Sequence, residues 1–178
     1  KLIISGRMLN PFGSLVLKLV RDMVDIELYP FRKKKVKAVF LHNIITDFLV
    51  ALNQDSILKD FSQYMKKCGY SPAFCTLNLP PLAQKLKDLQ IESPIIMSPF
   101  NKVGYQMNSS REACESTLRK NPEIKLIAMS TLAAGYLKPK EAYDYLFNEL
   151  DNISGVVVGV SSKEHAEETF TELQKYIK

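Results

Sequence analysis

Polar side chains able to bind ligands or move protons follow several short apolar segments of this chain. His42 follows the segment 36–41, where an imidazole can polarise a carbonyl group or shuttle a proton near neutral pH, or can equally be a half-buried, hydrogen-bonded ring. Lys102 lies in a long loop, where an amine among apolar neighbours can form a Schiff base or hold a carboxylate, or can simply be solvated. The other polar residues at such positions are Arg7, Asn43, Asp47, Thr76, Asn78, Ser98, Asn101, Ser130, Thr131, Ser161 and Ser162.

A second chemical signal is the stretch from Gly155 to His165, in which an apolar run ends in glycine and two serines where a helix must begin. Backbone N–H groups at such a turn, together with the positive end of the helix, can bind an anion. Ser161 and Ser162 are then anion ligands, although helix capping alone also explains them. His165, one turn into the helix, is either a surface residue or a further anion contact.

These residues are positioned by a repeated pattern of an apolar strand followed by an amphipathic helix. Apolar residues at three- and four-residue spacing predict a helix over residues 14–28, and the serine and glutamate pairs near Ser110 and Ser162 predict two further helix starts. Strands are predicted at residues 1–5, 36–41, 73–78, 94–98, 125–130 and 156–160. Because strands that are apolar on both faces alternate with helices, the sheet must be parallel.

The pattern favours a barrel over an open nucleotide-binding sheet. Neither a Gly-x-Gly-x-x-Gly turn after the first strand nor a P-loop is present. A barrel of eight strands takes about 250 residues, whereas this chain of 178 residues has about six strand and helix units. We therefore predict an α/β fold, an incomplete parallel (β/α) barrel of TIM type that forms one partial domain over residues 1–178. Its functional side chains should gather at the carboxyl ends of the strands, beneath a lid formed by residues 99–108.

Composition and charge restrict the class of protein. With 46% apolar residues and no apolar run near the roughly 18 residues of a membrane span, we expect a globular protein that does not enter a membrane. Three widely spaced cysteines without histidines at ligand spacing indicate reduced thiols, a cytoplasmic location and no metal site. The net charge of +5 owes much to residues 32–37, interpreted as a solvated loop and not as a nucleic-acid site. Residues 1–5 are too short for a signal-peptide core, so we expect a truncated or cleaved start.

Four motifs, taken in order, resemble the later strands of the aldo/keto reductase superfamily. They are Phe40-Leu41-His42, Thr76-Leu77-Asn78 after Gly69, the Ile-Ala-Met-Ser-Thr-Leu-Ala-Ala-Gly-Tyr-Leu segment at 127–137, and the Val-Gly-Val-Ser-Ser-Lys-Glu-His segment at 158–165. The resemblance covers about residues 36–175. It implies a TIM barrel that binds a nicotinamide dinucleotide phosphate, NADP, without a Rossmann motif, and substrates that are carbonyl compounds.

The same resemblance implies roles for individual residues. His42 matches the active-site histidine, and Asn78 matches the amide that holds the nicotinamide carboxamide. The expected cofactor contacts are Ser130, Leu132 and Gly135 along the pyrophosphate, and Ser161, Ser162 and His165 at the adenosine-phosphate end. The catalytic tyrosine and aspartate of the family belong to an earlier segment that this sequence lacks, Arg7 stands where a catalytic lysine is expected, and Thr169 replaces an asparagine.

Three functions follow from these observations. The first is the NADP-dependent reduction of a small carbonyl compound, with His42 and Arg7 as catalytic residues and with Asn43, Thr76 and Lys102 at the substrate. The second is a ligand-binding or scaffolding barrel that has lost the catalytic tyrosine, and the third is a lysine-dependent aldolase that uses Lys102. The expected ligand is a small carbonyl compound or a phosphorylated metabolite. Because an incomplete barrel leaves two unpaired edges, we also expect a homo-oligomer.

Overall fold

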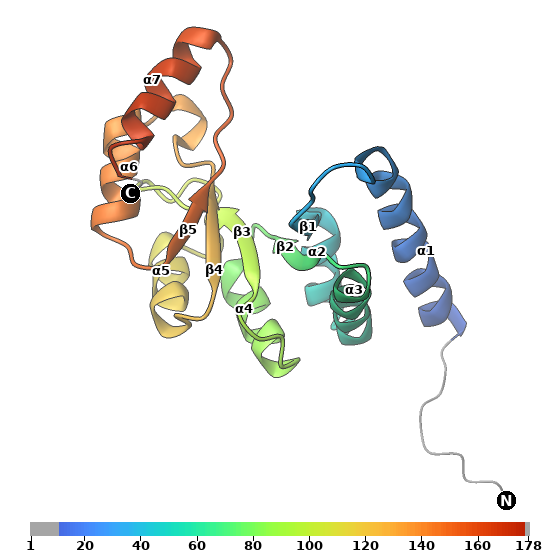
Figure 1. Ribbon diagram of the computed structural model, residues 1–178. Helices are drawn as coiled ribbons and strands as arrows, with labels where there is room; N and C mark the ends of the chain where they lie inside the picture. The colour runs from blue at the N-terminus through green and yellow to red at the C-terminus, as the bar shows by residue number, and fades with distance from the viewer. Residues whose placement is uncertain (1–10, 177–178) are drawn as a thin grey trace, which may run out of the picture.

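The computed structural model describes residues 11–176, which form a layered arrangement of strands and helices (Figure 1). The strands are β1 (Ala38–Leu41), β2 (Ser71–Cys75), β3 (Ile95–Pro99), β4 (Lys125–Met129) and β5 (Ile153–Val156). The helices are α1 (Pro11–Leu28), α2 (Asn43–Ala51), α3 (Asp55–Lys67), α4 (Leu79–Asp88), α5 (Arg111–Lys120), α6 (Pro139–Asn148) and α7 (Lys163–Leu173), with 3₁₀ turns η1 (Tyr29–Phe31) and η2 (Ala133–Gly135). The predicted strand at 1–5 and the predicted catalytic Arg7 lie outside the described residues.

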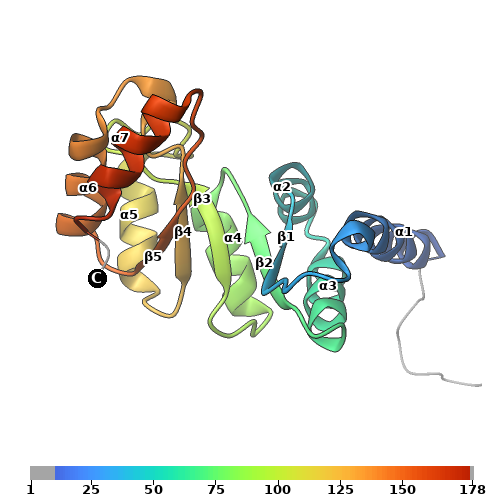
Figure 2. The ribbon, with the colours of Figure 1, turned by 45° about the horizontal axis from the view of Figure 1, so that its top comes forward.

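All five strands are parallel, and their order in the sheet is their order in the chain. Right-handed crossovers between consecutive neighbours place the connecting helices on the same face of the sheet. The predicted α/β class and parallel sheet are therefore confirmed. Within the described residues the sheet is open, with β1 at one edge beside α1 and β5 at the other beside α6 and α7 (Figure 2).

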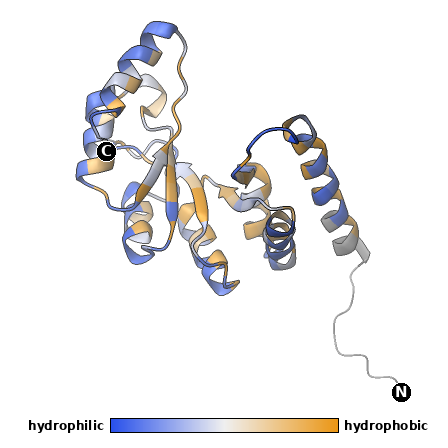
Figure 3. Ribbon diagram, viewed as in Figure 1, coloured by the Kyte–Doolittle hydropathy of each residue, from blue (hydrophilic) through white to orange (hydrophobic). Residues whose placement is uncertain are grey.

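One face of the sheet forms the hydrophobic core with the helices. Phe74, Ile96 and Leu126 are fully buried there, and they occupy equivalent positions on β2, β3 and β4. The ring of Phe74 packs edge-on against Phe61 of α3, with 5.7 Å between ring centroids. Burying a side chain of this size contributes about 1.5–3 kcal/mol. In Figure 3 the apolar residues gather along the strands and on the inward helix faces.

The opposite face of the sheet is also apolar, but its side chains lie outside the main core. Ile95, Met97, Ile127 and Met129 are each only partly buried. The Sγ atom of Cys75, on the same face, lies 4.0 Å from the Sδ atom of Met129. In a closed barrel this face would be the interior. Among the described residues it has no second covering layer comparable with the helices.

Helix α1 is attached to the rest of the molecule through α3. Arg21 forms an ion pair with Asp60, and the hydroxyl of Tyr64 donates to the Asp25 carboxylate at 2.8 Å. This bond to Asp25 raises the pKa of Tyr64 to about 12. The basic segment 32–35 that follows η1 is exposed and hydrophilic (Figure 3), as the sequence predicts for a solvated loop.

Two strands lie earlier in the chain than the sequence predicts. β2 (Ser71–Cys75) begins two residues and ends three residues before the predicted strand at 73–78, and β5 is displaced as well. The residues after β1 form two helices, because His42 caps α2 and a turn at residues 52–54 separates α2 from α3. β5 begins three residues and ends four residues before the corresponding ends of the predicted strand at 156–160, because Val156 is the last residue paired with β4. The N–H of Val157 still donates to the carbonyl of Ala128 at 2.9 Å, after which the chain leaves the sheet toward α7.

None of the helices between residues 11 and 176 combines the length and the apolar composition that a bilayer span needs. The same residues contain no group of three or more histidine, cysteine, aspartate or glutamate side chains placed to hold a metal ion.

Candidate functional site

A cavity of about 780 Å³ lies at the carboxyl ends of β4 and β5. Its floor is formed by the end of β4, and its walls come from the turn that includes η2, from the connection between β5 and α7, and from one face of α7. Tyr105 and Gln106 of the loop after β3 complete the lining. In such folds, small molecules usually bind at the carboxyl ends of the parallel strands, in a cavity of about this size.

The turn after β4 has an unusual backbone conformation. Ser130, Ala133, Ala134 and Gly135 have φ angles of 53°, 47°, 57° and 89°, and three of these residues carry a Cβ that disfavours positive φ. Such strain, about 1–3 kcal/mol per residue, concentrates at functional sites. Consecutive residues in this region direct their N–H groups into a concave surface that binds anions.

Some N–H groups of this turn remain available to a ligand. Ala133 and Gly135 donate to the carbonyls of Ser130 and Leu132, both at 2.9 Å. Within the described part of the chain, the N–H groups of Thr131, Leu132 and Ala134 have no hydrogen-bond acceptor. These donors lie on residues that line the cavity.

Thr131 provides an independent indication of a ligand. Its side chain lines the cavity and is only 1% exposed, yet its hydroxyl has no hydrogen-bond partner among the described residues. A buried hydroxyl without a partner costs about 1–3 kcal/mol. A ligand oxygen in the cavity would satisfy this group.

The amino end of α7 forms the opposite wall. Ser162 caps the helix and accepts from the N–H of His165 at 3.2 Å, while Ser161 Oγ is hydrogen-bonded to His165 Nδ1 at 2.8 Å. Hydrogen bonding to its own backbone N–H and to Ser162 lowers the pKa of Glu164, as the positive end of a helix favours. Ser161 and His165 line the cavity, whereas Ser162 acts as the cap.

The structure brings five of the seven predicted cofactor residues to this cavity. They are Ser130, Leu132, Gly135, Ser161 and His165. The other two, Ser162 and Asn78, are not part of its lining, and Asn78 precedes α4 without a hydrogen bond from its side chain to the helix. The predicted catalytic residue His42 and the predicted substrate residues Asn43, Thr76 and Lys102 also lie outside the lining.

His42 and Thr76 have structural contacts. His42 Nδ1 accepts from the N–H of Ile44 at 3.3 Å and so caps α2, which begins at Asn43. The buried Thr76 hydroxyl donates to the Asp47 carboxylate and accepts from the N–H of Asn78 at 2.8 Å. These bonds fix the end of β2 to α2.

Lys102 does not have the apolar surroundings that its proposed Schiff-base chemistry requires. It is exposed, and its Nζ lies 3.3 Å from Glu141 Oε1. The loop that contains it is anchored by the buried Asn101, whose amide accepts from the N–H of Tyr105 at 2.7 Å and donates to the Ser130 carbonyl at 3.2 Å. The expected lid is therefore a packed loop that positions Tyr105 at the cavity.

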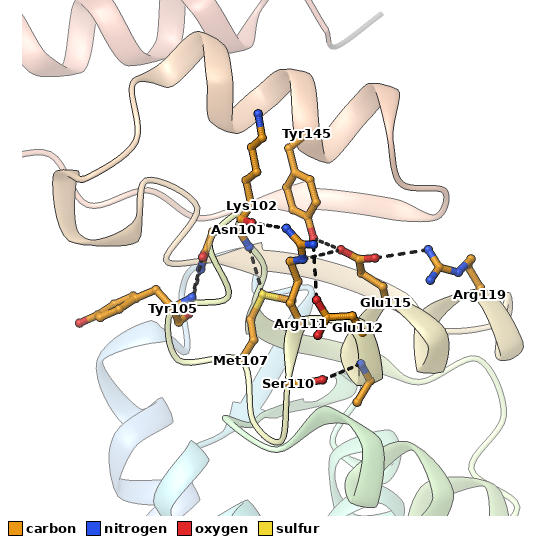
Figure 4. Close-up of polar contacts among 11 residues, drawn as sticks. Asn101, Lys102, Tyr105, Met107, Ser110, Arg111, Glu112, Glu115, Arg119 and Tyr145 are labelled. Carbon is orange, nitrogen blue, oxygen red and sulfur yellow. Dashed lines mark hydrogen bonds and ion pairs between the residues drawn. The ribbon is translucent and has the colours of Figure 1, made fainter.

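A polar cluster behind this loop holds it against α5 and α6 (Figure 4). Arg111 donates to the carbonyl of Lys102 and lies 3.4 Å from Glu115, which also accepts from the Tyr145 hydroxyl at 2.8 Å. Burial and the bond to Glu115 raise the pKa of Tyr145, so this hydroxyl stays protonated and donates.

Two charged residues of the cavity, Lys138 and Glu168, are absent from the sequence prediction. Lys138 lies just before α6 and Glu168 lies one turn after His165 on α7, so neither stands at a strand end. The helical spacing of 165, 168 and 169 is the signal that would have found Glu168, because these positions share one face of a helix.

Comparisons with protein-family models, curated proteins and solved structures find no match to this chain.

Proposed function

We propose that this chain is part of an aldo/keto-reductase-like (β/α) barrel that binds a nicotinamide dinucleotide in the cavity at the ends of β4 and β5. NADP is the form that the sequence resemblance implies. The observation that carries the proposal is the meeting, in one cavity, of five residues predicted from that resemblance with a strained anion-binding turn and the unpaired Thr131 hydroxyl.

The donor set of the cavity fits a phosphate-bearing ligand. The free N–H groups after β4, the Thr131 hydroxyl, Lys138 and Ser161 are all able to donate a hydrogen bond to a ligand, and the amino end of α7 adds a positive potential. A volume of about 780 Å³ is also in the range of sites for drug-sized ligands. A bound nicotinamide dinucleotide supplies the hydride that reduces a carbonyl group.

The residues expected to transfer a proton give weaker support for carbonyl reduction than the cavity gives for dinucleotide binding. His42 lies outside the cavity lining and uses Nδ1 to cap α2. Within the cavity, Tyr105, Lys138, His165 and Glu168 are of side-chain types that can act as general acids toward a carbonyl oxygen. This separation of His42 from the cavity favours a second candidate function, a barrel that binds the dinucleotide without reducing a substrate.

The aldolase alternative receives no support from the contacts of Lys102, because this lysine is exposed and ion-paired with Glu141. We further propose that the protein is cytoplasmic, since Cys68, Cys75 and Cys114 are free thiols. The edges of β1 and β5, which have no neighbouring strand within residues 11–176, and the half-exposed face of the sheet support a homo-oligomer. A single monomeric species in sedimentation at micromolar concentration would contradict that assembly.

The binding proposal is tested with Gly135→Val and the control Gly69→Val. Both glycines have similar positive φ angles, 89° and 85°, and an added Cβ would meet no atom within 4 Å at either position. The two variants should lose similar stability, but only Gly135→Val should weaken binding of NADPH and NADH, measured by calorimetry. Equal affinity in the two variants, or no binding by the unmodified protein, would refute the proposal.

A further inference from the structure

The buried side chain of Asn101 connects the loop after β3 to the turn after β4, although Asn101 is not part of the cavity lining. Its Nδ2 atom donates to the carbonyls of Tyr105 at 2.8 Å and of Ser130 at 3.2 Å. Its Oδ1 atom accepts from the N–H of Tyr105 at 2.7 Å (Figure 4). Since Nδ2 faces two carbonyl oxygens and Oδ1 faces an N–H group, the hydrogen bonds fix the orientation of the amide.

The two peptide groups that flank Ser130 are both held by this loop. The carbonyl of Met129 accepts from the N–H of Phe100 at 3.0 Å, and the carbonyl of Ser130 accepts from Asn101. Ser130 has a φ of 53°, a conformation that a residue with a Cβ keeps only where its surroundings hold it. These two bonds therefore help to hold the left-handed conformation at the start of the turn.

The bond from Asn101 also sets the direction of the Thr131 N–H. The peptide bond between Ser130 and Thr131 is trans, so this N–H points opposite to the Ser130 carbonyl. That carbonyl points toward Asn101, and it also accepts from the N–H of Ala133 at 2.9 Å. The Thr131 N–H therefore points away from Asn101, on a residue that lines the cavity. A rotated peptide group would instead turn its carbonyl oxygen, which repels anions, toward a ligand.

We propose that Asn101 is a positioning residue, which holds the Ser130–Thr131 peptide group so that the Thr131 N–H binds a phosphate group in the cavity. This inference rests on the proposed function, because it assigns the phosphate of the dinucleotide to the turn after β4. The same amide holds Tyr105, which also lines the cavity. The conformation of the loop and the affinity of the turn for an anion are therefore coupled through one buried side chain.

The first test follows the amide resonances of the unmodified protein by NMR during titration with inorganic pyrophosphate. An anion on the Thr131 N–H polarises the peptide group whose carbonyl accepts from Asn101, because hydrogen bonds in a chain strengthen one another. The Thr131 N–H and the Asn101 side-chain amide should therefore shift together, with one dissociation constant. The side-chain amide of Asn121, which donates to the carbonyl of Thr117 at 2.8 Å, should not shift. A Thr131 resonance that does not shift while pyrophosphate binds would overturn the proposal.

The second test measures the affinities of Asn101→Ala and Asn101→Asp for pyrophosphate and NADPH by calorimetry. The aspartate keeps an acceptor for the Tyr105 N–H but has no amide to donate to the Ser130 carbonyl. Both variants should bind pyrophosphate about 10- to 150-fold more weakly, the loss expected for one hydrogen bond to a charged group. The matched controls Asn121→Ala and Asn121→Asp should keep the affinity of the unmodified protein. A merely structural role would lower the thermal stability of all four variants and leave binding unchanged.

The outcomes separate the role of Asn101 from the proposed function. Unchanged affinity in a folded Asn101→Ala, or a loss confined to Asn101→Asp and so due to its added charge, refutes the role of Asn101 while the proposed function stands. Weaker pyrophosphate binding by both variants, in a protein that does not bind NADPH, supports this role and refutes the proposed function. If the unmodified protein binds neither ligand, both are refuted. If the Asn101 variants do not fold, the titration of the unmodified protein decides.

Discussion

Replacing Thr131 by valine tests whether the cavity is built around a ligand. The Thr131 hydroxyl is buried and has no hydrogen-bond partner among residues 11–176, so the folded protein lacks about 1–3 kcal/mol that a satisfied hydroxyl would retain. Valine has nearly the same shape and removes the unsatisfied group. We therefore expect that Thr131→Val does not lower the free energy of unfolding. The removal of the unsatisfied hydroxyl should raise it by about 1 kcal/mol or more.

The matched control is Thr46→Val. Thr46 is equally buried, but its hydroxyl donates to the carbonyl of Leu41 at 3.1 Å. Loss of this bond should lower the free energy of unfolding by about 1 kcal/mol. Urea denaturation followed by circular dichroism measures both changes.

The same substitution should act in the opposite direction on binding. A hydrogen bond to a charged phosphate contributes about 1.5–3 kcal/mol, so Thr131→Val should weaken dinucleotide binding about 10- to 150-fold. Thr46→Val should leave the affinity unchanged because Thr46 does not line the cavity. If Thr131→Val destabilises the protein as much as Thr46→Val does, or binds the dinucleotide normally, the reasoning fails.

Two further predictions concern His42 and Tyr143. His42→Ala removes the cap of α2 and should lower the free energy of unfolding, measured by urea denaturation, by about 1 kcal/mol. The affinity for the dinucleotide should not change. A loss of affinity would instead indicate that His42 takes part in binding. Burial raises the pKa of Tyr143 to about 12, above its unfolded value near 10, so the stability it contributes is complete below about pH 10 and is lost as the pH rises toward 12. Tyr143→Phe should reduce that alkaline loss in pH-dependent urea titrations, and an unchanged profile would contradict this account.

The sequence predicts the repeating elements well because each carries its own local signal. The run before His42 and the capping serines Ser110 and Ser162 mark a strand and two helix starts that the structure contains. The boundary of β5 was wrong because Val157 and Val160 are as apolar as a strand, yet both are exposed at the cavity side of the molecule. Pairing with β4, which is not encoded locally, ends the strand at Val156.

From the pattern of strands alone, the candidate site was predictable only where its residues follow strands. Ser130 and Ser161 follow β4 and β5, so a rule about strand ends finds them. Glu168 belongs to the second turn of a helix, and its exposure to the cavity depends on how α7 packs against α6. The capping role of His42 likewise depends on the helix α2, whose start at Asn43 is not predicted from the sequence.

The consecutive strand order has a consequence for how the chain acquires its structure. Each strand pairs only with the strands before and after it in the sequence, so every ladder of the sheet closes over one helical connection. The first paired residues are 33 apart from Ala38 to Ser71 and 22 apart from Ala73 to Ile95. Growth of the sheet one strand at a time therefore avoids the larger entropy losses that pairings between more distant strands impose.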